Sequence, residues 1–87
     1  MKKTIYIMSD SHDEPIVFTD RKEALEFMTD ILKDHGKHYY YEEEEIKECI
    51  DEMTNEFCNN EKFFKGYLGE RQVCCYTQEE EFKEEKR

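Results

Sequence analysis

The sequence predicts a small α+β domain in which helices pack on one face of an antiparallel sheet, in the order β-β-α-α-β with an optional C-terminal helical turn. Three observations lead to this fold class. Residues 4–9 and 72–77 alternate in the manner of strands, whereas residues 21–35 place apolar side chains at helical spacing. A second helical pattern lies within residues 39–57. Helices that follow one another between strands pack together on a sheet face.

The chain length fits one domain. The 87 residues lie in the size range where a single core leaves only a few kcal/mol of net stability. Charged residues make up 41% of the chain, but the 12 phenylalanines and tyrosines supply enough apolar surface to fold it. We expect a compact unit over residues 1–78, followed by a charged tail or short helix over residues 79–87.

The first predicted strand, residues 4–9, carries Ile5 and Ile7 on one face and is rich in β-branched and aromatic residues. A polar run follows and ends at Pro15. Residues 16–18 then form a second short extended segment. A β-hairpin is the simplest connection between the two.

The first helix is predicted over residues 21–35. Asp20, with Glu23 three residues later, is a variant of the capping box, and Phe18 is placed to pack over the first turn. Gly36 is the expected C′ residue that ends the helix. The exposed side of this helix mixes positive and negative charges.

The second helix has an apolar stripe at positions i, i+3, i+4, i+7 and i+11, formed by Ile46, Cys49, Ile50, Met53 and Phe57. Residues 39–41 either form a short strand or lead into the helix. Asn59 and Asn60 indicate its end, although Phe63 and Phe64 would let it continue to Gly66. The helix therefore has one side for the core and one side that faces solvent.

The C-terminal part contains the last predicted strand, residues 72–77, after a turn bracketed by Gly66 and Gly69. Thr77 with Glu80 has the spacing of a helix cap. The final residues therefore form either a short helix or a frayed tail.

The net charge of -10 is concentrated in one segment. Residues 1–37 carry -2, residues 38–61 carry -8, and residues 62–87 are neutral. A field this negative repels nucleic acid and anionic membranes and attracts basic surfaces. The expected partner is therefore a basic protein, with no direct nucleic-acid or membrane binding.

The cysteines are expected to be reduced structural thiols. The chain has no apolar run long enough for a signal peptide or membrane span, which favours a cytoplasmic location. Paired spacing of the kind that zinc sites use is absent from their sequence. We therefore expect no disulfide, no metal and no cofactor. The four residues are Cys49, Cys58, Cys74 and Cys75.

Residues 42–56 hold eight carboxylates and one lysine in fifteen residues. On a helix this is roughly one net negative charge per 3 Å, at ~1.5 Å per residue. A DNA strand carries one phosphate per ~3.4 Å of axis, so the charge density resembles that of a phosphate backbone. On a helical wheel, Glu42 and Glu43 fall beside the apolar stripe. They therefore join the acidic face only if the helix starts after them. The predicted partner-binding carboxylates are Glu42, Glu43, Glu44, Glu45, Glu48, Asp51, Glu52 and Glu56.

In size and charge pattern, and through these carboxylates, the chain resembles the small acidic inhibitors made by phages. These include DNA-mimic anti-restriction proteins and anti-CRISPR proteins. The resemblance rests on size and charge pattern and involves no shared motif. It implies stoichiometric occlusion of a basic nucleic-acid-binding site in a host protein, without turnover, in the host cell cytoplasm.

Tyr39, Tyr40 and Tyr41 precede the acidic run and are further candidates for partner contact, because tyrosine is enriched at interfaces. They also support an alternative function. The protein could be a structural or regulatory adaptor, or a homodimer, whose acidic face only keeps it soluble. No catalytic residues are predicted, because the sequence has no glycine-rich phosphate-binding loop and gives no support for a cysteine–histidine nucleophilic pair.

Residues 9–13, Ser-Asp-Ser-His-Asp, follow the first strand and support a second alternative. They resemble the opening motif of calcineurin-like metallophosphoesterases, in which Asp10 and His12 would bind a metal. The later motifs that complete that two-metal site are missing from this sequence. A polar hairpin loop is the preferred interpretation, and a metal-binding loop of Asp10, His12 and Asp13 is the alternative.

Overall fold

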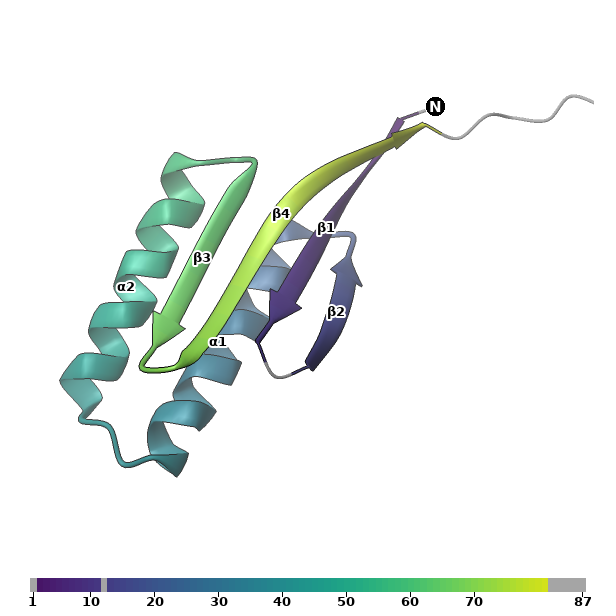
Figure 1. The fold of residues 1–87 in the computed structure, drawn as a ribbon. Helices are drawn as coiled ribbons and strands as arrows, with labels where there is room; N and C mark the ends of the chain where they lie inside the picture. Colours follow the sequence, from purple (N-terminus) through teal and green to yellow (C-terminus); the bar gives the residue numbers. More distant parts are fainter. Residues whose placement is uncertain (1, 12, 82–87) are drawn as a thin grey trace, which may run out of the picture.

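The computed structural model describes residues 2–11 and 13–81, with the backbone alone at residues 2, 13, 80 and 81. Four strands and two helices follow one another in the order β-β-α-α-β-β (Figure 1). The fold is α+β, as predicted. The elements are β1 (Lys2–Asp10), β2 (Asp13–Phe18), α1 (Arg21–His38), α2 (Glu43–Asn59), β3 (Phe63–Leu68) and β4 (Arg71–Glu81).

The sheet is antiparallel throughout, with strand order β2-β1-β4-β3. The first and last strands are therefore neighbours at its centre, and the hairpin partners β2 and β3 form its edges (Figure 1). The β1–β4 pairing runs without interruption from Lys2 opposite Glu81 to Asp10 opposite Val73. The predicted β1–β2 hairpin forms, with an irregularity in register between Met8 and Asp10.

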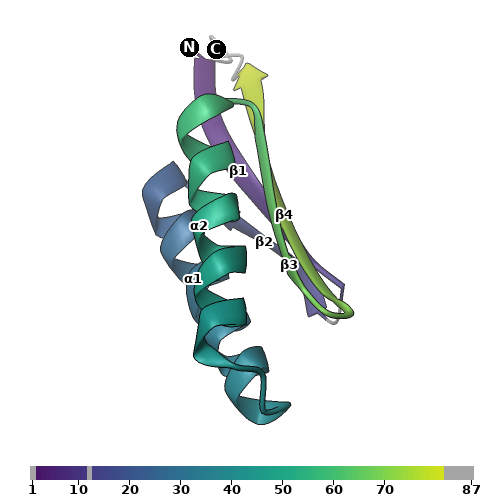
Figure 2. The same ribbon diagram turned by 90° about the vertical axis from the view of Figure 1, so that its left-hand side faces the viewer.

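Both helices lie on the same side of the sheet, and the opposite side is uncovered (Figure 2). Every second residue of β3 and β4 points toward the helices, so these strands bury one face and expose the other. Burial of this apolar set drives folding. The buried apolar residues are Met8, Ala24, Met28, Leu32, Ile46, Met53, Phe64, Leu68, Val73 and Cys75.

Helix α1 begins as predicted and ends later than predicted. The Asp20 side chain accepts a hydrogen bond from the Lys22 amide at 2.9 Å, which caps the N-terminus. Gly36 does not end the helix, which continues to His38. Instead, Gly36 is buried where α2 crosses, and a Cβ atom there would lie 2.5 Å from Ile46 Cδ1. The glycine lets the two helices approach closely.

Helix α2 ends at Asn59 and does not continue through Phe63 and Phe64. The Asn60 side chain accepts hydrogen bonds from the amides of Lys62 and Phe63, which reverses the chain into β3. Arg21 holds the two helices together here, because its guanidinium lies 4.2 Å from the centre of the Phe57 ring and donates to the Asn60 carbonyl.

Strand β3 is the element missing from the predicted order. Its side chains alternate between exposed and buried, and it pairs with β4 from Phe63 opposite Tyr76 to Leu68 opposite Arg71. Gly69, with φ of 60°, begins the two-residue turn to β4, as type II′ hairpins require. Strand β4 continues to Glu81, so no helical turn forms over residues 77–81. The remainder of the predicted tail, residues 82–87, lies outside the described residues.

Candidate functional site

The carboxylates of α2 surround the solvent side of the helix. Glu42 is the N-cap residue, and its side chain makes no capping hydrogen bond. Glu43, Glu44 and Glu45 form the first turn, where negative charge interacts favourably with the helix dipole. Glu56 is half-buried, and the other seven predicted carboxylates are exposed. The side of α2 that is away from the core faces the viewer in Figure 2, with no other element in front of it.

These side chains do not form a single row. Helical spacing directs Glu44, Glu48 and Asp51 away from the core. Glu45 and Glu52 lie toward the β3–β4 turn, where they and Glu48 line a shallow groove of about 210 Å³ with Tyr41 and Tyr67. The acidic surface therefore curves around the helix toward the edge of the sheet.

Glu43 lies on the opposite flank of α2. It lines a hollow between the two helices together with three lysines, Lys33, Lys37 and Lys47. The lysines of α1 therefore border one side of the acidic surface. Within residues 2–11 and 13–81, no ion pair involves any of the eight α2 carboxylates.

The three tyrosines form the corner between the helices and belong to neither a strand nor a helix. Tyr41 is half-buried, and its hydroxyl lies against Gly69 in the β3–β4 turn. Tyr39 is exposed and packs on two histidines, with ring centres 4.7 Å from His35 and 4.8 Å from His38. The corner therefore has a packed inner side and an aromatic outer side.

Tyr40 is 93% exposed and has a φ of 59°, in the left-handed region that favours glycine. Its amide bonds to the Lys37 carbonyl at 3.4 Å, and the Tyr41 amide bonds to the Gly36 carbonyl at 2.9 Å. These two bonds make a Schellman motif with Tyr40 at C′, where glycine is the usual residue. A large side chain thus occupies a strained position without packing inside the domain.

Two of the four thiols pack in or against the core, Cys75 within it and Cys49 beside it. Burial raises the pKa of the Cys75 thiol to about 11. Burial also raises the pKa of Cys49, with a further contribution from the nearby Glu52 carboxylate. A thiol with a raised pKa is a poor nucleophile near neutral pH. Cys58 is exposed and Cys74 is half-buried, and all four thiols are free.

Asp10 and Ser11, at the end of β1, are bonded to the start of β4. Asp10 is buried, and both of its carboxylate oxygens accept hydrogen bonds from Arg71. The Ser11 amide donates to the Gln72 carbonyl, and the Gln72 amide donates to the Ser11 hydroxyl. His12 lies outside the described residues. Asp10, one of the two ligands that the metallophosphoesterase resemblance implies, is thus bound to an arginine, and no group of three potential metal ligands occurs in the described part of the chain.

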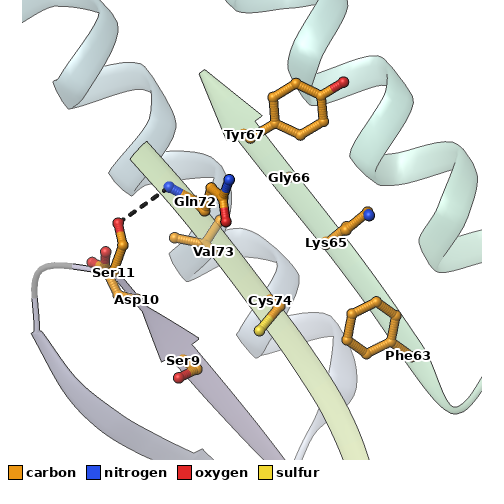
Figure 3. Close-up of a pocket in the computed structure, with 10 residues that line it drawn as sticks. All are labelled: Ser9, Asp10, Ser11, Phe63, Lys65, Gly66, Tyr67, Gln72, Val73 and Cys74. Atoms are coloured by element: carbon orange, nitrogen blue, oxygen red, sulfur yellow. Dashed lines mark hydrogen bonds between the residues drawn. The ribbon is translucent and has the colours of Figure 1, made fainter. Parts of the chain in front are cut away.

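A second surface, missed in the sequence, is a hollow of about 450 Å³ on the uncovered side of the sheet. Figure 3 shows Phe63, Lys65 and Tyr67 along β3 on one side and Cys74 on β4 beside them, with Ser11 bonded to Gln72 at one end. The alternation in residues 63–68 was the signal that could have revealed it, because it predicts a strand with Phe63, Lys65 and Tyr67 on one face.

Comparison of this chain with protein-family models, curated proteins and solved structures finds no match. Among the described residues, neither helix has the length and apolar character needed to cross a bilayer. The geometry therefore offers an acidic helix beside a tyrosine corner, and an uncovered sheet face.

Proposed function

We propose that this protein is a non-enzymatic binding protein that occludes a basic nucleic-acid-binding surface of another protein, as DNA-mimic inhibitors do. The binding surface comprises the exposed α2 carboxylates and the neighbouring Tyr39 and Tyr40. The observation that carries the proposal is the exposure of seven of the eight carboxylates of α2 and its N-cap, with no ion pair to them from the described residues. Unneutralised like charges repel one another, so this surface gains most from a positively charged partner.

The curvature of the acidic surface fits a groove-shaped partner. Carboxylates on the outer side of α2 and on its β3 flank reach lysine and arginine groups on two walls of a cleft. Arginine pairs with carboxylates and with phosphates through the same planar geometry, so a phosphate-binding surface accepts carboxylates in its place.

Tyr40 supplies the second support. The Tyr40 backbone is left-handed at the end of α1, next to the first turn of α2, and its ring is exposed. Residues held in strained conformations concentrate at functional sites. A tyrosine with this exposure adds apolar contact area beside the charges, and tyrosine is a frequent hot-spot residue.

The test is a triple charge reversal, Glu44→Lys, Glu48→Lys and Glu52→Lys, followed by capture of partners from lysate of the native host. Wild-type protein is expected to retain a nucleic-acid-binding protein at low salt, to release it at high salt, and to lose it to added duplex DNA. The captured protein is expected to lose DNA binding when the wild-type chain is added. The triple variant is expected neither to capture this protein nor to block its DNA binding.

A matched control reverses three exposed acids on α1 instead, through Glu23→Lys, Glu26→Lys and Asp30→Lys. This control changes the net charge by the same amount and leaves α2 intact. It is expected to capture the partner as wild-type protein does. Equal loss of capture in both triple variants would refute a defined binding surface on α2, because the total charge would then explain the result.

A further inference from the structure

The uncovered side of the sheet carries an apolar row that crosses all four strands. In the strand register, Val17 lies opposite Ile7, Ile7 opposite Tyr76, and Tyr76 opposite Phe63. Residues opposite one another in antiparallel strands project from the same face. Figure 1 views the sheet from this uncovered side, with α1 behind it.

Three of the four side chains of this row are exposed, and Ile7 is half-buried. Val17 is 57% exposed, Tyr76 42% and Phe63 37%, and the neighbouring Tyr67 is 54% exposed. Single apolar residues on a surface need no explanation, but a contiguous apolar patch marks an interaction site. The hollow of about 450 Å³ lies next to this row and leaves room for side chains from outside the domain (Figure 3).

The charge on this face differs from that of the rest of the protein. Two lysines, Lys3 and Lys65, occupy paired positions of this face, and the position opposite Lys3 in the register is Glu80. The whole chain, in contrast, has a net charge of -10. A basic partner surface gains little from a face with so few acids, and two lysines are too few to attract a strongly acidic one. The face therefore suits an apolar surface of low charge.

We propose that the uncovered sheet face binds the same face of a second copy of this chain. Two copies stacked in this way form a β-sandwich, with their helices on the outside and their acidic surfaces far apart. Approach through α2 would instead bring the two sets of carboxylates together. This dimer leaves α2 and Tyr40 free, so it does not depend on the proposed function.

The face has enough area for a small dimer interface. Strands of 9, 6, 6 and 11 residues, at ~3.3 Å per residue and ~4.8 Å between strands, cover about 500 Å². Two copies then bury about 1,000 Å², at the lower limit of specific interfaces. The dimer is therefore reversible and depends on concentration.

The test is sedimentation equilibrium of the full chain over a wide concentration range, at low and at high salt. A monomer–dimer equilibrium is expected, with tighter association at high salt because salt screens the repulsion between two chains of charge -10. This salt response is opposite to the one expected for partner capture by α2, so the two proposals fail separately. A monomer at every concentration and salt would overturn the dimer.

Two variants locate the interface. Tyr76→Glu places a carboxylate in the centre of the apolar row and is expected to abolish the dimer. Tyr40→Glu makes the same change on the helix side and is expected to leave the dimer intact. Equal dimerisation of the two variants would contradict the proposal. If Tyr76→Glu lowers the melting temperature, Val17→Glu on the exposed edge strand makes the same test with less effect on folding.

Discussion

Arg71 donates a hydrogen bond to each oxygen of the buried Asp10 carboxylate, with Nε 2.9 Å from Oδ1 and Nη2 2.6 Å from Oδ2. The Asp10 side chain is 1% exposed, and Arg71 is partly open to solvent. The pair joins the end of β1 to the start of β4 and so fixes the central strands in register. Bidentate pairs of this kind are directional as well as strong.

The first prediction concerns this pair. Arg71→Ala leaves a buried carboxylate without its partner and is expected to lower the free energy of unfolding by about 3–5 kcal/mol. The double variant Asp10→Ala with Arg71→Ala is expected to lose less than the sum of the single variants, as measured by urea denaturation. Additive losses would show that the two side chains are not coupled.

The second prediction concerns Tyr40. Tyr40→Gly is expected to raise the free energy of unfolding by about 1 kcal/mol, because glycine adopts the left-handed conformation at C′ without a steric penalty. Thermal denaturation measures the gain. Tyr39→Gly is the control, because Tyr39 has a φ of -102° and its ring packs on His35. That variant is expected to be less stable than the wild type.

The third prediction concerns the crossing of the helices at Gly36. Gly36→Ala puts a Cβ atom 2.5 Å from Ile46 Cδ1 and is expected to destabilise the domain by about 1–3 kcal/mol. Combining it with Ile46→Ala removes the obstructing side chain. Chemical denaturation should therefore give a double-variant loss smaller than the sum of the two single losses, and strict additivity would argue against the close contact.

The fourth prediction concerns Cys75 and pH. Burial raises the pKa of its thiol from 9.0 to about 11, so the unfolded chain releases this proton at lower pH than the folded chain does. Its contribution to stability is thus complete below pH 9 and is lost as the pH rises toward 11. Urea denaturation across this range should show a smaller decline for Cys75→Val than for the wild type. Cys58→Ala, at an exposed thiol, should follow the wild-type curve.

Thiol modification at neutral pH offers an independent measurement. An added thiol reagent is expected to label the exposed Cys58 in the folded protein and to label Cys75 only after unfolding. Rapid labelling of Cys75 under native conditions would contradict its burial.

The elements that the sequence predicts correctly are those with local signals. Asp20 caps α1 because its side chain reaches an amide two residues away, and the apolar stripe of α2 follows from spacing within one helix. Strand β3 was missed because adjacent Phe63 and Phe64 fit a continued helix as well as a strand. The pairing with β4 decides between them, and that pairing is a non-local property.

The candidate site was predictable in composition and not in shape. The acidic residues are evident in the sequence, but their spread toward Tyr41 and Tyr67 depends on where β3 lies. No local pattern indicates that Tyr40 takes the C′ position, since Gly36 offers the usual signal four residues earlier. The Asp10–Arg71 pair spans 61 residues and becomes visible only once the sheet order is known.

The position of β1 and β4 at the centre of the sheet also determines when this chain can fold during synthesis. β1 is made before the other five elements, and its longest pairing is with β4, the last of the six to leave the ribosome. The β1–β2 hairpin and the helix pair can form transiently before then, but neither encloses the core. Completion of the domain therefore waits until β4 has left the ribosome, and a ribosome stalled before β4 holds an apolar half-sheet that chaperones would bind.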